Sequence, residues 1–372
     1  MNQVFYRKYR PKSFSEVIGQ EHVVQTLTNA LKSGAVSHGY LFSGPRGSGK
    51  TTLARLLAKS VNCSNRGSTG SPEPCNQCDS CREINEGRNI DLTEIDAASH
   101  RGIDEIRELK EGIKFSPTKS KYKVFIIDES HQLTKEAANA LLKTLEEPPA
   151  HAIFILATTE LHKMIPTIVS RCQHFEFRRL KLAEIIQRLR FIAGKEGIKI
   201  DPAALEMIAL SSGGSFRDAE GLLDQAAAFS GQADKKETTI SAEDLRELMG
   251  VVEVQKISRL MDRLAEKNAA QAIILLNAAF DQGADLSQLV IGLIGHLHAT
   301  LMYKIGGEQL HDPLSDGLTD EEFQKLKERA GKFPEEELRR LINLLLEAQQ
   351  QMKSSPIIQL PLELAFAEFC GI

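Results

Sequence analysis

The sequence predicts an α/β domain built on a parallel sheet, followed by two parts that are helical throughout. Apolar, β-rich runs alternate with segments of helical periodicity up to about residue 178, and no strand pattern follows. The runs are almost continuously apolar, which is typical of strands covered by helices on both faces. The predicted strands are 39–43, 92–96, 123–128, 152–158 and 173–177, and the predicted helices between them are 21–33, 52–62, 102–114 and 135–146.

The rest of the chain predicts two helical domains. Three short helices are expected at 181–195, 202–212 and 215–230, with Asp201-Pro202 as a helix start and Gly213-Gly214 as a break. A polar connection at 231–241 leads to long amphipathic stretches, notably 285–304 and 335–352. We therefore expect an α/β domain at 1–178, a small three-helix domain at 179–242 and a larger all-helical domain at 243–372.

Composition excludes a disordered chain and a membrane-embedded one. Apolar residues make up 42% of the chain and charged residues 26%, and the formal net charge is -4. The N-terminus carries no apolar signal region, and no stretch reaches about 18 uninterrupted apolar residues. We expect a cytoplasmic protein in which any nucleic-acid binding depends on a local basic patch.

A glycine-rich turn lies between the first predicted strand and the helix that follows it. Residues 44–51 read GPRGSGKT and match the pattern G-x-x-x-x-G-K-[ST], whose backbone N–H groups surround phosphate oxygens. Lys50 would reach the β- and γ-phosphates, and Thr51 would coordinate Mg²⁺. The residues expected to hold the phosphates are Gly44, Pro45, Arg46, Gly47, Ser48, Gly49, Lys50, Thr51 and Thr52.

Two carboxylates end the strand at 123–128 and favour hydrolysis over transfer to a second substrate. Asp128 is expected beside the metal, and Glu129 where it polarises a water for attack on the γ-phosphate. Thr158, at the end of a neighbouring strand, could hold that water, and Arg171 could complete the site of an adjacent subunit. The plainer interpretations, a strand-end threonine and a solvated arginine, stay open.

The cysteines indicate a metal site. Four of the six fall within nineteen residues, and in a cytosolic chain such a cluster favours a metal over disulfides. Four thiolates close a tetrahedral Zn²⁺ shell, which predicts a structural ion that orders a segment too polar to fold alone. An iron–sulfur cluster and buried free thiols stay open as rivals. The predicted ligands are Cys63, Cys75, Cys78 and Cys81, whereas Cys172 and Cys370 are expected to be core residues.

Further motifs carry a family resemblance over residues 4 to about 225. They are 9–14 (YRPKSF), 17–20 (VIGQ), the loop 44–51, the cysteine insert after the first helix of that loop, 128–131 (DESH), 141–149 (LLKTLEEPP), 157–159 (ATT), 170–172 (SRC) and 214–218 (GSFRD). Together they resemble the AAA+ ATPases, and within them the clamp-loader gamma/tau subunits of bacterial DNA polymerase III. The cysteine insert together with SRC is the specific part of the match.

The resemblance implies roles for residues of the predicted nucleotide site. Thr158 is similar to the family's first sensor, Arg171 to an arginine finger acting in trans, and Arg217 to a second sensor in a helical lid at 179–242. The residues that resemble the adenine pocket are Arg10, Pro11, Val17 and Ile18. Ser99 and Arg101 resemble the start of a helix that faces DNA, although an ordinary capped helix explains them equally well.

The resemblance also implies an assembly. Family members form a spiral pentamer with delta and delta-prime subunits through a C-terminal collar, here 243–372. With ATP bound, the spiral opens the sliding clamp and grips primer–template DNA, and hydrolysis releases both. The chain ends where the third domain of the family ends, so we expect that the extensions by which tau contacts the helicase and the polymerase are missing. Nothing in the chain resembles a polymerase site with paired catalytic carboxylates.

Three alternatives stay open at this level. A nucleotide kinase with a zinc-bound lid would share the phosphate loop, but it leaves the C-terminal helices without a task. A non-catalytic nucleotide-binding scaffold would be expected to lack several of the polar site residues. Another AAA+ DNA motor, for branch migration or helicase loading, would share the site but not the cysteine insert.

Overall fold

The structure, a computed structural model, describes residues 3–66, 70–99, 112–113, 115–230, 239–248, 254–307 and 320–372. It divides into two compact units, Met1–Ser241 and Ala242–Ile372. The expected boundary after residue 242 falls beside this division, whereas the expected boundary after residue 178 lies inside the first unit.

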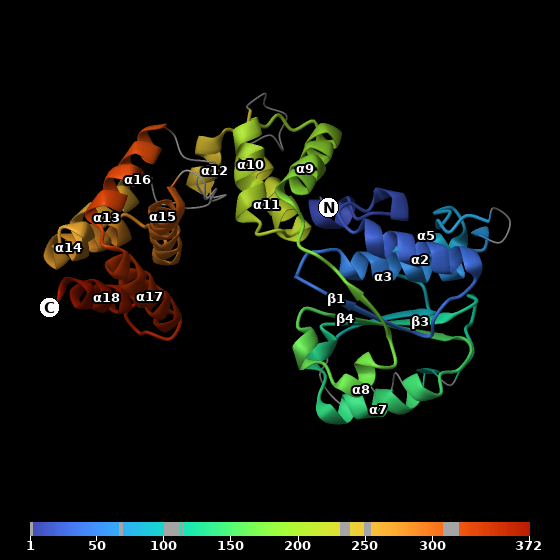
Figure 1. The fold of residues 1–372 in the computed structure, drawn as a ribbon. Helices are drawn as coiled ribbons and strands as arrows, with labels where there is room; N and C mark the ends of the chain where they lie inside the picture. Colours follow the sequence, from blue (N-terminus) through green and yellow to red (C-terminus); the bar gives the residue numbers. More distant parts are fainter. Residues whose placement is uncertain are drawn as a thin grey trace. The chain divides into compact units, whose positions relative to one another are not determined.

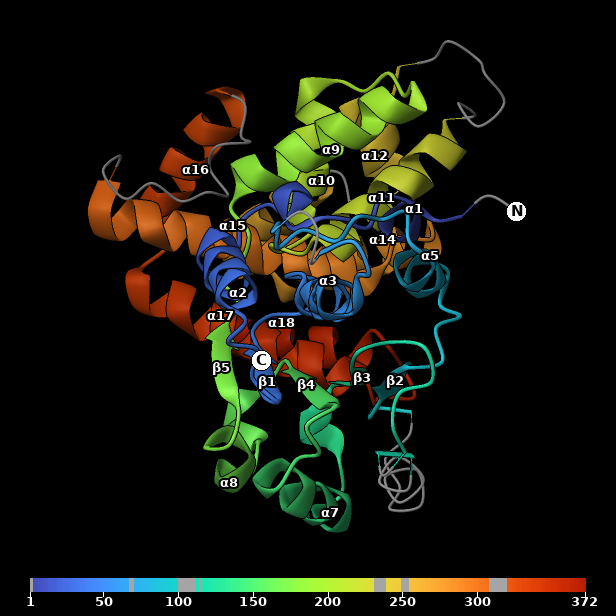
Figure 2. The ribbon, with the colours of Figure 1, turned by 90° about the vertical axis from the view of Figure 1, so that its right-hand side faces the viewer.

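The first unit is built on a five-stranded parallel sheet with the order β2-β3-β4-β1-β5 (Figure 2). β1 and β4 are buried along their whole length because they are central and covered on both faces. The predicted strands are confirmed, with the last one a residue shorter than expected. Their bounds are β1 Gly39–Ser43, β2 Leu92–Asp96, β3 Lys123–Asp128, β4 Ala152–Thr158 and β5 Gln173–Glu176.

Helices cover both faces of this sheet (Figure 1). α2 and α3 pack one apolar cluster against it, around Leu27, Leu53 and Phe42, and α7 and α8 pack a second cluster on the opposite face. The predicted helix at 102–114 lies outside the described residues except for 112–113. The helices of this part are α1 Phe5–Lys8, α2 Glu21–Ser33, α3 Lys50–Asn62, α5 Asp79–Glu86, α7 Lys135–Glu146 and α8 Pro166–Val169, with short 3₁₀ turns at Phe14–Glu16, Ser130–Gln132 and Leu161–Lys163.

Three further helices complete the first unit, and each lies where the sequence predicts one. They are α9 Leu182–Glu196, α10 Pro202–Ser211 and α11 Phe216–Phe229. The Ser215 hydroxyl caps α11 by accepting from the Asp218 N–H. These helices pack on one another, and α11 also packs on α1 at the N-terminus.

The second unit is entirely helical in its described residues. Its helices are α12 Ala242–Leu248, α13 Val254–Ala265, α14 Ala269–Asp281, α15 Leu286–Gly306, α16 Asp320–Lys332, α17 Glu335–Met352 and α18 Leu360–Cys370. α15 is long and apolar enough to cross a membrane, but Leu289, Leu293 and Leu297 on it lie in the core of this unit. Its apolar character therefore has a packing explanation.

Candidate nucleotide site and cysteine module

A cavity of about 800 Å³ opens in the first unit at the carboxyl ends of the strands. The phosphate loop and the ends of β2 and β3 form its floor, which is where open α/β sheets bind ligands. The N-terminal segment and the start of α11 form its walls. Many of the side chains that face the cavity are basic, including Arg10, Arg46, Lys50, Arg55 and Arg217, so it suits a polyanionic ligand.

The phosphate loop is folded tightly between β1 and α3. Gly44 and Gly47 have positive φ values of 146° and 73°, and a Cβ on Gly47 would lie 1.9 Å from the Ser215 hydroxyl oxygen. The Phe216 N–H donates to the Gly47 carbonyl at 3.2 Å, so α11 is attached to the loop. Of the predicted loop residues, Arg46 through Thr52 line the cavity, and the Gly44 and Pro45 carbonyls accept from Lys50 instead.

Lys50, Thr51 and Asp128 meet at the floor of the cavity. The Thr51 hydroxyl donates to Asp128 Oδ2 at 2.7 Å, which joins two residues 77 positions apart. The Lys50 ammonium donates to two loop carbonyls at 2.8 Å. Burial lowers the pKa of Lys50, and the nearby Glu129 and Asp128 carboxylates oppose that shift. A hydroxyl beside a carboxylate at the end of a strand offers the oxygen ligands that Mg²⁺ prefers.

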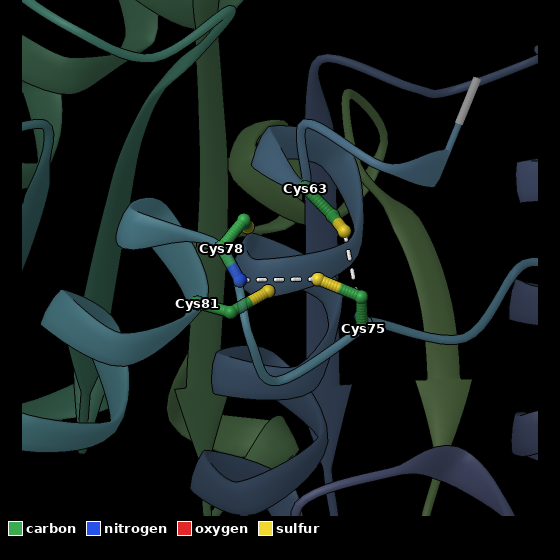
Figure 3. Close-up of side chains that lie close together, drawn as sticks. All are labelled: Cys63, Cys75, Cys78 and Cys81. Carbon is green, nitrogen blue, oxygen red and sulfur yellow. Dashed lines mark hydrogen bonds between the residues drawn. The ribbon is translucent and has the colours of Figure 1, made fainter. Parts of the chain in front are cut away.

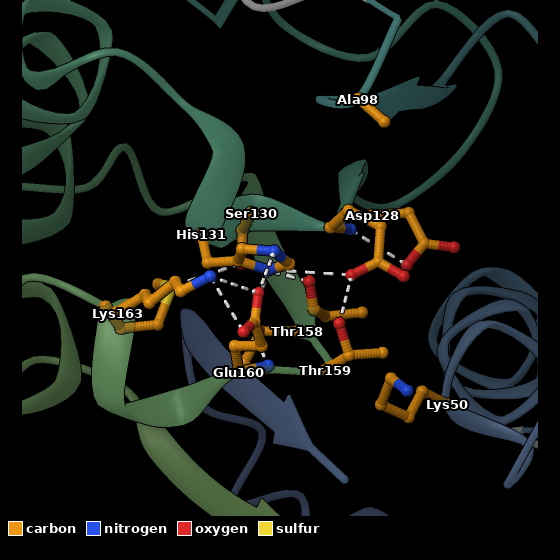
Figure 4. Close-up of polar contacts among 12 residues, drawn as sticks. Lys50, Ala98, Asp128, Ser130, His131, Thr158, Thr159, Glu160 and Lys163 are labelled. Carbon is orange, nitrogen blue, oxygen red and sulfur yellow. Dashed lines mark hydrogen bonds and ion pairs between the residues drawn. The ribbon is translucent and has the colours of Figure 1, made fainter. Parts of the chain in front are cut away.

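Glu129 is held by a polar network that the sequence did not predict. Its backbone is left-handed, with φ 47°, and its carboxylate accepts from the Thr159 hydroxyl at 2.8 Å. His131, whose side chain is 6% exposed, has Nδ1 3.0 Å from Thr158 Oγ1 and Nε2 3.0 Å from Glu160 Oε2 (Figure 4). Motif spacing carried no signal for this network, because its members follow two different strands.

The structure places Thr158 and Arg171 differently from the other predicted catalytic residues. Thr158 pairs with Ser43 at the strand ends and is fully buried, with its hydroxyl directed to His131 and the Glu160 N–H. Arg171 bonds to Glu146 at 2.6 Å and to the Thr167 carbonyl at 2.8 Å. Neither of these described residues lines the cavity, whereas Lys50, Thr51, Asp128, Glu129 and Arg217 do.

The residues expected around the base lie on the other side of the cavity. Arg10, Pro11, Val17 and Ile18 all line it. Burial lowers the pKa of Arg10, and the Arg55 guanidinium adds to the shift. Arg217, in the first turn of α11, lies with its guanidinium 5.1 Å from the centre of the Tyr6 ring.

The sequence did not predict a buried ion pair between Arg188 and Glu220, which also line the cavity. Arg188 Nε of α9 donates to Glu220 Oε1 of α11 at 2.8 Å, and Arg188 also bonds to the Tyr9 carbonyl. Burial raises the pKa of Glu220 although Arg188 opposes it. The pair connects both helices to the N-terminal segment, and the separation of its members in the sequence gives no periodic signal.

The expected DNA-facing pair can be described only in part. Ser99 is exposed just after β2 and donates to Asp96 Oδ2 at 3.2 Å. Arg101 lies outside the described residues.

The four clustered cysteines converge on one point (Figure 3). Their Sγ atoms all lie within 4.8 Å of one another. A tetrahedral shell with Zn–S bonds of about 2.3 Å places its sulfurs about 3.8 Å apart, so the four thiols fit a Zn²⁺ ion after a small contraction. Cys63 directly follows α3, Cys75 and Cys78 lie in the loop before α5, and Cys81 lies on α5.

Backbone amides favour the thiolate form of one of these cysteines. Burial by itself would raise the pKa of Cys75, but N–H groups of Gln77 and Cys78 donate to its sulfur and lower the pKa to about 6. Burial raises the pKa of Cys63 and Cys81. Cys172 is half-buried against the second apolar cluster and Cys370 packs against the core of the second unit, as predicted.

Three family models match this chain. "DNA polymerase III, delta subunit" matches residues 19–181, "DNA polymerase III clamp loader subunit, ATPase lid domain" matches 184–232, and "DNA polymerase III subunits gamma and tau domain III" matches 240–370. The lid model covers α9 to α11, and the domain III model covers the second unit.

Named relatives agree with these models. The DNA polymerase III subunit tau of Bacillus subtilis is 42% identical over 99% of this chain and 63% of that protein. The subunit gamma of Buchnera aphidicola from Acyrthosiphon pisum is 35% identical over 98% of this chain and 97% of that protein. The chain thus spans less than two thirds of the tau relative and almost all of the gamma relative.

Among solved structures the similarity is weaker. The Thermotoga maritima RuvB branch migration motor is 23% identical with a TM-score of 0.48, over 74% of this chain and 86% of that one. That similarity is too low to carry an argument about function. The chain belongs to the gamma/tau subunit family of bacterial DNA polymerase III.

Proposed function

We propose that this chain is an ATP-hydrolysing clamp-loader subunit. ATP binding allows the assembled complex to open the sliding clamp and hold primer–template DNA, and hydrolysis releases the loaded clamp. The observation that carries the proposal is the bond between Thr51 and Asp128, which unites the phosphate loop with the acidic strand end at the floor of a basic cavity. Family membership supports the same function.

We assign each of these residues one role in ATP binding or hydrolysis. Lys50 and the loop amides hold the phosphates, and Arg10, Pro11, Val17 and Ile18 contact the base. Thr51 and Asp128 would hold Mg²⁺, which neutralises charge on the β- and γ-phosphates. Glu129 polarises the attacking water. Thr158 lies outside the cavity lining, at the end of the neighbouring strand, and its proposed role is to position that water. Arg217 senses the γ-phosphate from the lid at 179–242.

The remaining parts serve assembly. The helical domain at 243–372 acts as the collar that joins copies of this chain to delta and delta-prime subunits. Arg171 reaches the nucleotide of an adjacent subunit, and Ser99 and Arg101 contact the DNA backbone. Cys63, Cys75, Cys78 and Cys81 hold a structural Zn²⁺. The protein works in the cytoplasm, where the replication machinery operates.

Replacing Lys50 tests the ATP site. Lys50→Ala removes the cation that reaches the phosphates, so we expect ATP binding to be lost and clamp loading on primed DNA to stop. The matched control is Lys135→Ala, an exposed lysine in the first turn of α7. Normal clamp loading by Lys50→Ala would refute the assignment.

Replacing Arg171 tests the action in trans. Arg171→Ala should leave ATP binding intact and abolish hydrolysis in the complex with delta and delta-prime. Since Arg171 bonds to Glu146, Glu146→Gln breaks the same ion pair while keeping the guanidinium. An equal loss of hydrolysis in the two variants would show that Arg171 matters only through that pair.

A further inference from the structure

The cysteine module, taken as the described residues 63–66 and 70–81, is bonded to the segment that forms one wall of the cavity. That wall segment is residues 10–18, of which all but 13–15 line the cavity. Glu73 of the module accepts two backbone N–H groups of the wall segment, from Phe14 to Oε2 at 2.7 Å and from Ser15 to Oε1 at 2.9 Å. These are the first amides of a 3₁₀ turn, which has no internal acceptor for them. A carboxylate is a strong acceptor for both.

A second connection joins the module, the wall segment and the phosphate-loop helix. The Lys12 carbonyl accepts from Asn76 Nδ2 at 3.0 Å and from Lys59 Nζ at 3.0 Å. Lys59 also donates to Asn76 Oδ1. Lys59 lies on α3, whose first residue is Lys50, and it is 2% exposed. The module therefore contacts the wall through side chains on both sides of Cys75.

Asn76 is also bonded to Asn85 of α5 and to the Pro74 carbonyl, so its position depends on the backbone of the module itself. The sequence between Cys63 and Cys75 is rich in glycine, serine and proline, and proline supplies its only apolar side chains. Asn76 has a φ of 57°, a left-handed backbone that non-glycine residues adopt at a cost. Four cysteine ligands that bind one metal would fix this backbone and, with it, the positions of Glu73 and Asn76.

We propose that the metal-loaded cysteine module stabilises the wall segment of the nucleotide cavity, with Glu73 and Asn76 as its positioning residues. They order residues 10–18 against α3 and so raise the affinity for the base and sugar part of the nucleotide. The phosphate loop is held by the sheet and by α11 instead and does not depend on the module. This inference rests on the proposed function, because it takes the ligand to be ATP.

The test compares two ligands in a variant that keeps every cysteine. Glu73→Ala combined with Asn76→Gly deletes the contacts to the wall, and glycine tolerates the left-handed backbone at position 76. We expect a dissociation constant for ATP about tenfold higher, as for the loss of a few hydrogen bonds that are partly buried or exposed. The dissociation constant for inorganic tripolyphosphate, which has no base, should not change. The bound zinc should stay at the wild-type level.

The control is Asp79→Asn, which also removes an acidic group from the module. The Asp79 carboxylate accepts from Arg82 on the same helix and not from the wall segment. This variant should bind both ligands as the wild type does. An unchanged affinity for ATP in the double variant, or an equal loss for ATP and tripolyphosphate, would overturn the inference. A wild-type chain that binds no ATP would instead refute the proposed function.

Metal removal gives an independent measurement. Stripping the metal from the wild-type chain should speed hydrogen exchange at the Phe14 and Ser15 amides, which donate to Glu73, and leave the amides of β4 protected. Unchanged exchange at Phe14 and Ser15 would contradict the proposal that the module stabilises the wall segment.

Discussion

The cavity end of the first unit and the core of the second unit are stabilised by different contacts. At the cavity and the adjoining strand ends, several buried polar side chains have specific partners, as in the bonds of Lys50, Ser130 and Thr158. In the described part of the second unit, Thr300 and Arg329 are the only buried polar residues, and the core consists of leucine, phenylalanine and other apolar side chains.

This difference explains why one region carries motifs and the other does not. A phosphate site requires particular atoms at particular places, which restricts residue types and spacing. An apolar core requires volume and periodicity, which many sequences supply. Substitutions in the cavity should therefore affect chemistry, and substitutions in the second core should affect stability.

The largest effect is expected for Glu129→Gln. Loss of the carboxylate that polarises water should reduce ATP hydrolysis by about 10² to 10⁴-fold, while ATP still binds. Single-turnover hydrolysis in the assembled complex, together with an equilibrium binding assay, measures both. Glu136→Gln, an exposed acid on α7, is the control. A variant that hydrolyses ATP at the wild-type rate would remove Glu129 from the site.

The next largest effect is expected for Phe366→Ala in the second unit. The side chain is fully buried, so truncation should cost about 3–5 kcal/mol of unfolding free energy. Urea denaturation measures this, and the affinity for ATP should not change. Leu364→Ala on the same helix, where the side chain is 58% exposed, should cost less than about 0.5 kcal/mol. A weaker affinity for ATP in Phe366→Ala would show that the division between the two regions is incomplete.

Thr158→Val tests a polar contact inside the first unit. Valine keeps the shape but leaves His131 Nδ1 and the Glu160 N–H without their partner, which should cost about 1–3 kcal/mol in stability. Thr167→Val, at an exposed position, provides the comparison in thermal denaturation. Equal melting temperatures for the two variants would mean that the buried hydroxyl contributes nothing.

The smallest effect is expected for Asp91→Asn, just before β2. Burial would raise the pKa of Asp91, but N–H groups of Thr118, Lys119 and Ser120 donate to its carboxylate and hold the pKa below its ordinary value. Since the folded-state pKa is lowered, the stabilisation is present above about pH 4 and is lost as pH falls through the folded-state pKa. The variant should be about 1 kcal/mol less stable at pH 7. That difference should close at low pH, and a constant difference would contradict the assignment.

Most of the first unit could be predicted from the sequence. The strands from 39–43 to 152–158 have the predicted bounds. For the three central strands, 39–43, 123–128 and 152–158, the reason is that central parallel strands are almost continuously apolar and end at polar residues. The helix of the phosphate loop begins two residues earlier than predicted, at Lys50, because the glycine-rich turn passes directly into it. His131, Thr159 and the Arg188–Glu220 pair could not be predicted, since their partners are set by how strands and helices are placed in space.

The sequence by itself determined the strands and most of the described helices, the phosphate loop, the acidic strand end and the cluster of four cysteines, because each is encoded by residues close together in the chain. Only the tertiary structure decided which distant residues meet. It brought Thr51 to Asp128, directed the Thr158 hydroxyl to His131, and joined Glu73 and Asn76 to the wall of the cavity. Contacts between distant segments depend on sheet order and packing, which no local pattern records.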